Sequence, residues 1–296
     1  MQAPKRIKIF VVAALVALLG LLLFVTNRST PHRQLPSPNG YDDFVKAGKM
    51  LSGRLYEYGD WNEEKLREFV IENAEPLRLV RLGLSRECRV PNEYSPTYLT
   101  ARMTEFMSFK EMAFGFAIEG KVAELDNRMG DAAKSYLDAI LFGNESSRGG
   151  VLISRLVGTA CEGIGLNNLQ KLSNKLSAKE CRDSVRFLES IDKKREPVRE
   201  TLNHEKEWAR QAESFREKIS SLWPPNYRDE KHMVQFGLEE IQSRERKFKS
   251  IMIDVAARAY ELEKGQHPKS IAELVPDHLK AIPKDPLTGT NMIYKP

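Results

Sequence analysis

The apolar residues of this chain follow two different patterns. Between Ile9 and Thr26 every residue except Gly20 and Thr26 is apolar, and none carries a charge. From residue 41 to residue 265, apolar residues instead recur at three- and four-residue spacing, which is the period of amphipathic helices. The sequence therefore predicts one continuous apolar helix, followed by a mainly α domain of several amphipathic helices.

Prolines, glycines and capping residues indicate where the amphipathic helices begin and end. Pro76 should kink or split the second of them because it lacks a backbone N–H, and Ser95-Pro96 fits a helix start. Gly265 is a credible C-cap for the last helix, and residues 143–150 indicate a loop. The expected helices cover approximately residues 42–55, 62–84, 97–128, 131–142, 151–175, 177–194, 197–222 and 229–264.

The apolar segment 9–26 has the length of a membrane span. As a helix, its 18 residues extend about 27 Å, close to the roughly 30 Å hydrocarbon core of a bilayer. Lys5, Arg6 and Lys8 precede it, and basic residues favour the cytoplasmic side. We therefore expect residues 9–26 to lie in the lipid bilayer, with a cytoplasmic N-terminus. The bulk of the chain is then extracytoplasmic, in a bacterial periplasm.

Two other interpretations of this segment remain open. A cleaved signal peptide has an apolar region of about 7–15 residues and ends in a small-x-small site, whereas this longer run exits through Phe24-Val25-Thr26-Asn27-Arg28. The other alternative is a buried helix of a soluble domain. The uncleaved anchor is the interpretation we favour. It divides the chain into a cytoplasmic N-terminus (1–8), an anchor (9–26), a proline-containing stalk (27–40), a helical domain (41–265) and a tail (266–296).

The charge of the chain changes once the anchor is set aside. The whole sequence has 46 basic and 41 acidic residues, a net charge of +5. Three of the basic residues precede the apolar segment, which leaves 43 against 41 and a net charge of +2 for the rest. Because nucleic-acid binding needs a clustered positive surface, we expect no nucleic-acid partner.

The segment 116–139 carries small residues where two helices could approach closely. They are Gly120, Ala123, Ala132 and Ala139, with Tyr136 placed to cover the contact. In this pattern the segment resembles one tetratricopeptide unit, which implies a helix–turn–helix with its turn at Gly130-Asp131. The pattern does not recur one repeat length further on, so an ordinary tight helical hairpin is the simpler interpretation.

The tail is the most specific stretch of the sequence. Residues 260–294 follow a spaced pattern of aromatic, proline, glycine and acidic positions: Tyr260, Leu262, Gly265, Pro268, Ser270, Glu273, Leu274, Pro276, Pro283, Asp285, Pro286, Gly289 and Tyr294. This pattern resembles the C-terminal segment of type II secretion pseudopilins. The resemblance implies a structural segment that packs back on the preceding helix, with a tight turn at Gly289. Residues 292–294 are the one strand candidate.

The order of these parts gives a second, broader resemblance. An N-terminal anchor, a stalk, Asn39-Gly40-Tyr41-Asp42-Asp43, Cys88-Arg89-Val90-Pro91, a central hairpin, Ser147-Arg148-Gly149-Gly150 and the tail follow one another. The layout resembles membrane-anchored helical proteins of planctomycete-type bacteria whose role is uncharacterised. It implies no known activity.

Residues that could carry chemistry are scattered, and none forms a recognised catalytic motif. His204, His267 and His278 lack metal-ligand spacing. We interpret the first as a solvated helix residue and the other two as contacts to turn carbonyls. Ser190 begins an S-x-x-K sequence on a charged helix. Gly149-Gly150, beside Arg148, could bind an anion at a helix N-terminus, although a loop before a helix is the simpler interpretation. No catalytic, cofactor-binding or metal-ligating residue is therefore assigned, and no cofactor is expected.

The sequence contains three cysteines: Cys88, Cys161 and Cys181. An exported domain permits disulfides, and an odd number leaves one thiol free. We interpret Cys161 as a buried thiol. A Cys161–Cys181 or a Cys88–Cys181 bridge remains open.

These observations favour a non-enzymatic envelope protein, a scaffold or protein-binding module with an envelope or secretion-related partner. An envelope enzyme or small-ligand binder, with a site assembled from distant helices, is the first alternative. A component of a pilus or secretion system is the second.

Overall fold

A computed structural model describes residues 34–53, 58–92, 98–217 and 230–294. Its α-helices are α2 (Gly40–Met50), α3 (Glu63–Glu72), α4 (Ala74–Leu84), α5 (Tyr98–Leu125), α6 (Met129–Ser146), α7 (Leu152–Leu172), α8 (Ala178–Lys194), α9 (Val198–Glu217) and α10 (Glu230–Lys264). Short 3-10 helices cover Tyr58–Asp60, Ser173–Lys175 and Ile271–Leu274. The predicted mainly α fold is confirmed for the described residues. The apolar segment 9–26 and the Ser95-Pro96 helix start lie outside them.

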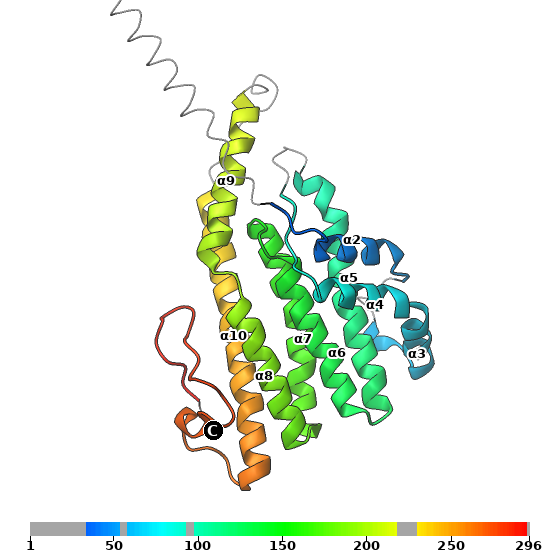
Figure 1. The fold of residues 1–296 in the computed structure, drawn as a ribbon, viewed down its shortest axis with the longest axis vertical. Coiled ribbons are helices and arrows are strands. Elements are labelled where there is room, and N and C mark those ends of the chain that lie inside the picture. The colour runs from blue at the N-terminus through cyan, green and yellow to red at the C-terminus, as the bar shows by residue number, and fades with distance from the viewer. Residues whose placement is uncertain (1–33, 54–57, 93–97, 218–229, 295–296) are drawn as a thin grey trace, which may run out of the picture. The chain divides into compact units, whose positions relative to one another are not determined.

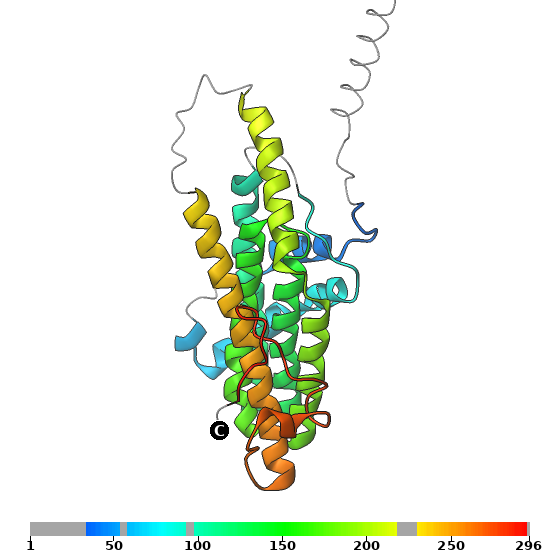
Figure 2. The ribbon, with the colours of Figure 1, turned by 90° about the vertical axis from the view of Figure 1, so that its left-hand side faces the viewer.

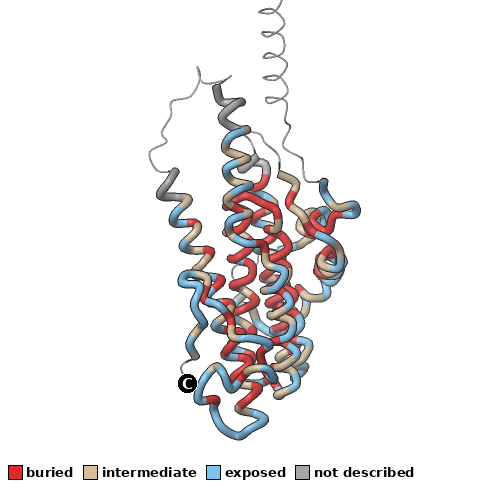
Figure 3. The backbone as a smooth tube through the Cα atoms, turned by 60° about the vertical axis from the view of Figure 1, so that its left-hand side comes forward, coloured by how far each residue is buried: buried red, intermediate tan, exposed pale blue. Residues whose placement is uncertain are grey.

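The long helices α5, α6 and α7 lie side by side and form the centre of the domain (Figure 1). The short helices α2, α3 and α4 pack against α5 and α6, whereas α8 and α10 pack against α6 and α7 from the other direction. Buried positions are concentrated in the middle of this arrangement, and exposed positions lie on its outer faces (Figure 3). Among the described helices, none is long and apolar enough to cross a membrane.

Aromatic side chains fill the core between α2, α5 and α6. Tyr41, Phe44, Phe109 and Phe142 are all at most 1% exposed. Their rings meet edge to face, with centroids 5.1 Å apart for Phe44 and Phe142 and 5.4 Å apart for Tyr41 and Phe109, a preferred aromatic geometry. This core fixes α2 across the α5–α6 hairpin.

The hairpin of α5 and α6 packs as its small residues predict. The Tyr136 side chain is fully buried against Gly120, where a Cβ atom would lie 2.7 Å from the ring carbon Cδ1. The turn is displaced from its expected place, because α6 begins at Met129 and Gly130 already belongs to its first turn. The hairpin geometry does not by itself identify a tetratricopeptide repeat.

The helices α6 and α7 approach each other through glycine. A Cβ atom on Gly158 would lie 2.5 Å from the backbone carbonyl oxygen of Gly143, so neither position has room for a side chain. The predicted loop over 143–150 is wrong for its first residues, because α6 continues to Ser146. Within its own segment, Gly143 suggests a helix break. In the structure a glycine is required at this position because Gly158 of α7 packs directly against it.

The second predicted helix is split, but not at the proline. Helix α3 ends at Glu72 and α4 begins at Ala74, with the Asn73 side chain buried between them and accepting a hydrogen bond from the Ser52 N–H at 2.9 Å. Pro76 lies in the first turn of α4, where the missing N–H leaves no helical hydrogen bond unmade. An Asn-Gly pair is typical of a turn, but Asn39 instead caps α2.

The tail lies along α10, as Figure 2 shows. Leu274 and Leu279 are buried against the α10 core, and Met292 and Tyr294 pack on it while partly exposed. Gly265 (φ +70°) ends α10 and Gly289 (φ +71°) forms the tight turn, both as predicted. The strand candidate 292–294 is wrong, because the described tail has only an isolated bridge between Lys284 and Asn291.

Candidate functional site

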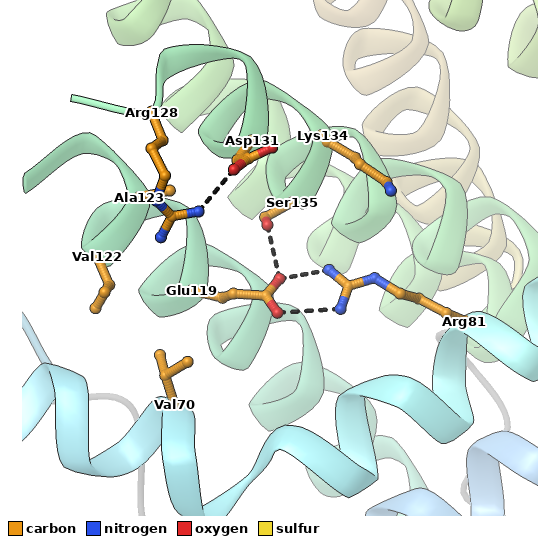
Figure 4. Close-up of a pocket in the computed structure, with 9 residues that line it drawn as sticks. All are labelled: Val70, Arg81, Glu119, Val122, Ala123, Arg128, Asp131, Lys134 and Ser135. Carbon is orange, nitrogen blue, oxygen red and sulfur yellow. Dashed lines mark hydrogen bonds and ion pairs between the residues drawn. The ribbon is translucent and has the colours of Figure 1, made fainter. Parts of the chain in front are cut away.

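A surface pocket of about 350 Å³ opens beside the α5–α6 hairpin (Figure 4). We call it the hairpin pocket. One side chain comes from α3, one from α4 and the others from α5, α6 and the turn between them. Its lining residues are Val70, Arg81, Glu119, Val122, Ala123, Arg128, Asp131, Lys134 and Ser135. The volume falls in the range of about 300–1,000 Å³ that is typical of ligand pockets.

The floor of the hairpin pocket is an ion-pair network centred on Arg81. Its guanidinium binds the Glu119 carboxylate with two parallel hydrogen bonds, one of them 3.0 Å long from Nη1 to Oε1. Its Nε donates to Asp138 Oδ2 at 2.7 Å, and the Ser135 hydroxyl donates to Glu119 Oε2 at 2.6 Å. Burial raises the pKa of Asp138, and the Arg81 charge opposes part of that shift. The network joins α4, α5 and α6 along the pocket wall.

A second network closes one end of the pocket. Arg128 binds Asp131 at 2.6 Å and Asp126 at 3.0 Å, and Arg67 of α3 also binds Asp126, at 2.6 Å. The hydrogen bonds from Arg67 and Arg128 hold the pKa of Asp126 below its usual value. The two arginines are therefore already paired with carboxylates of the chain.

Lys134 differs from the other charged residues of the pocket. It is exposed, and no hydrogen bond or ion pair joins its ammonium group to a described residue. In Figure 4 its side chain is directed away from Arg128 and Asp131. Lys134 is also the only exposed residue in the fully described stretch of α6 from Ala132 to Ser146. Its charge acts on the Asp138 carboxylate, so the hairpin pocket presents a cation that has an acidic neighbour but no hydrogen bond or ion pair with a described residue.

A second pocket, of about 410 Å³, lies between α6 and α8 and also uses Lys134. We call it the α6–α8 pocket. Its lining residues are Gly130, Ala133, Lys134, Leu137, Asp138, Lys179, Glu180, Asp183, Ser184 and Phe187. Lys134 therefore lies on α6 between the two pockets and lines both.

Carboxylates of the chain itself occupy the place where Gly149-Gly150 could bind an anion. The Gly149 N–H donates to Glu196 Oε2 at 2.9 Å, and the Leu152 N–H, at the start of α7, donates to Glu205 Oε2 at 2.7 Å. Carboxylates are favourable at such a helix N-terminus. Arg148 pairs with Glu145 at 2.6 Å. The favoured interpretation, a loop before a helix, is confirmed, and the carboxylates of Glu196 and Glu205 bond its N–H groups and the start of α7.

The histidines also find partners that the sequence did not indicate. His204 is half-buried, not solvated, and its Nδ1 lies 3.3 Å from the Gly150 carbonyl oxygen. His267 lies 3.5 Å from Glu261, and the buried His278 lies 3.0 Å from Glu263, so both contact carboxylates where turn carbonyls were expected. Ser190 donates to the Phe187 carbonyl oxygen at 2.7 Å. The structure does not bring these residues together in one site. Among the described residues, no group of three or more His, Cys, Asp or Glu side chains could hold a metal ion.

All three cysteines are free and buried, which confirms the interpretation of Cys161 and excludes the two bridges left open in the folded state described here. Burial raises the pKa of Cys88 and of Cys161 to about 12 and that of Cys181 to about 11. The thiolate is the reactive form of cysteine, so none of the three is placed to act as a nucleophile.

The raised pKa values predict a loss of stability in mild alkali. The folded state holds the thiol protons more tightly than the unfolded state, whose cysteine pKa is about 8.5. The stabilisation is therefore complete below about pH 8.5 and is lost as the pH rises toward the folded values near 11–12. We expect the urea midpoint to fall between pH 8 and 9.5, and Cys161→Ala to flatten this dependence. A midpoint that stays constant or rises would contradict it.

Sequence reasoning did not find the hairpin pocket. Arg81 is 38 residues from Glu119 and 57 from Asp138, and no spacing rule connects residues on three separate helices. The only local signal was the small-residue pattern of the α5–α6 hairpin, which predicts close packing but not a pocket. Comparison of the chain with protein-family models, curated proteins and solved structures found no match.

Proposed function

We propose that this chain is a membrane-anchored protein whose extracytoplasmic helical domain binds a protein partner in the cell envelope. The observation that carries the proposal is the hairpin pocket, where ion pairs surround apolar walls and Lys134 has no hydrogen bond or ion pair with a described residue. The segment 9–26 supplies the proposed anchor, since its length and the basic residues before it suit a single-pass helix. The domain then acts as a scaffold or binding module without catalysis of its own.

The pocket supports binding better than catalysis. Its acidic residues Glu119 and Asp131 are each engaged by an arginine, and general acid–base chemistry needs a group free to exchange a proton with substrate. A small-ligand binder is the second candidate, because several charged groups converge on the same pocket. The two candidates differ in what the pocket retains: a protein segment or a free small molecule.

Photo-crosslinking in cells tests the proposal. The full chain is produced with a benzoylphenylalanine residue in place of Asp131, at the pocket, or in place of Lys193, an exposed position on α8 outside both pockets. After irradiation, we expect a discrete protein adduct for the Asp131 variant, recovered in the membrane fraction after alkaline carbonate washing, and none for the Lys193 variant.

Three results would contradict the proposal. The first is an adduct pattern identical at the two positions, which would mean non-specific contact. The second is the absence of any protein adduct at Asp131. The third is release of the chain from membranes by carbonate, which would remove the anchor.

A further inference from the structure

We propose that α9 is a detachable helix, which pivots away from α7 at residues 195–197 while α5, α6, α7 and α8 stay folded. In the closed state that the structure shows, α9 contacts the N-terminus of α7. In the open state, the Leu152 N–H and the Thr201 side chain face water. This conformational step goes beyond the proposed function and does not depend on it.

The burial of α9 differs from that of the helix before it. Helix α8 places four apolar side chains in the core that it shares with α10: Cys181, Val185, Leu188 and Ile191. Among the α9 side chains that the structure describes, residues 198–210, Thr201 alone is fully buried. None of them joins the apolar cores around α10, around α2 and α5, or around α3. Burying valine, leucine or isoleucine stabilises a fold more than a typical hydrogen bond does in net terms, so α9 is held less firmly than α8.

Polar contacts hold α9 to α7. The Leu152 N–H, in the first turn of α7, donates to Glu205 Oε2 at 2.7 Å. On the same face of α9, His204 Nδ1 lies 3.3 Å from the Gly150 carbonyl oxygen. The Thr201 hydroxyl is buried without a hydrogen-bond partner among the described residues, which opposes the closed state. Water can replace the Leu152 and His204 contacts when α9 moves, so the opening leaves no polar group of this interface unsatisfied.

The connection between α8 and α9 supplies the pivot. Residues 195–197 separate the two helices, and the backbone of Arg195 is extended, with φ −60° and ψ 131°. The Arg195 guanidinium donates to Glu162 of α7 at 2.9 Å. Glu196 accepts a hydrogen bond from the Gly149 N–H, also at 2.9 Å. The pivot therefore stays attached to α7 while the helix beyond it moves, as hinge residues at the end of an element do.

Thiol labelling of the purified full chain in detergent measures the opening. Thr201→Cys places a thiol on the buried face of α9, and Ser184→Cys places one on α8; the two native side chains are 1% and 2% exposed. N-ethylmaleimide reacts with thiols that reach water, and peptide mapping by mass spectrometry distinguishes the new thiol from the three native cysteines. We expect Thr201→Cys to be labelled at least about tenfold faster than Ser184→Cys, because local opening is enough to expose it.

A second substitution tests what holds α9 closed. Glu205→Ala removes the acceptor of the Leu152 N–H and should speed labelling of Thr201→Cys about tenfold, which is the size of one hydrogen bond to a charged group. Labelling of Ser184→Cys should not change. Glu200→Ala is the matched control on the same helix, because the Glu200 carboxylate has no hydrogen bond or ion pair with a described residue.

Hydrogen exchange on the unaltered chain checks the pivot without any substitution. The Leu152 amide loses its acceptor when α9 opens, whereas the Gly149 amide keeps Glu196. We therefore expect the Leu152 amide to exchange faster than the Gly149 amide, read at single residues by electron-transfer fragmentation. Circular dichroism melting shows whether each variant remains folded. If Thr201→Cys lowers the melting temperature, the amide comparison decides.

Three results would overturn the inference. The first is equal labelling of Thr201→Cys and Ser184→Cys. The second is faster labelling of both thiols in Glu205→Ala, which would indicate opening of the whole domain. The third is a Leu152 amide that exchanges no faster than the Gly149 amide.

Discussion

Replacing Gly158 with valine should lower the melting temperature of the domain markedly. The new Cβ atom would lie 2.5 Å from the Gly143 carbonyl oxygen and 2.6 Å from Ser147 Cβ, and a backbone carbonyl cannot rotate away as a flexible side chain can. Overpacking a close helix contact costs about 1–3 kcal/mol or more. For a chain of this size, a loss of about 3 kcal/mol lowers the melting temperature by roughly 10 °C, which circular dichroism melting would measure.

Gly163→Ala is the matched control on the same helix. A Cβ atom there meets only Arg244 Nη1, at 3.3 Å, which is the far end of a flexible side chain. Alanine is also the better helix former by about 1 kcal/mol, so this variant should melt at or above the temperature of the unaltered chain. If Gly158→Val melts together with Gly163→Ala, the helices do not meet as closely as the structure places them.

This contact also shows why sequence reasoning failed for part of the fold. Helix period and caps are local signals, and they located α8 and the end of α10 at Gly265. Gly143 carries no local sign that distinguishes a helix breaker from a close packing point. Its role depends on Gly158, which belongs to another helix. Tertiary packing can override a local propensity in this way.

The candidate site was hidden for a related reason. The residues that build the hairpin pocket are ordinary surface residues in the sequence, because arginine and glutamate are common on exposed helix faces. Arg81 and Glu119 acquire a role only when α4 lies against α5. His204 was likewise interpreted as solvated because it lacks a metal-ligand spacing, yet its contact with Gly150 is set by the approach of α9 to α7.

Glu162→Ala should produce the other large loss of stability. Glu162 accepts a hydrogen bond from Arg195 Nη1 at 2.9 Å, and the two side chains are only 3% and 6% exposed. Burial opposes the charge of Arg195, but the Glu162 carboxylate outweighs it and the pKa of Arg195 is raised. Removing that carboxylate leaves a buried guanidinium whose Nε and Nη2 lack a hydrogen-bond partner and whose remaining ion pair, with the partly exposed Asp192, is 3.8 Å long. The expected cost is about 3–5 kcal/mol, measured by urea unfolding.

Two companion variants identify the cause of this loss. Glu75→Ala breaks the exposed Arg78–Glu75 pair, whose side chains are 63% and 55% exposed, and should leave the melting temperature nearly unchanged. The double variant Glu162→Leu with Arg195→Met replaces the buried charges by apolar groups of similar size, which is often neutral or stabilising. We therefore expect it to be more stable than Glu162→Ala alone. If it is not, the loss in Glu162→Ala arises from the cavity left behind, because the second substitution removes the buried Arg195 charge.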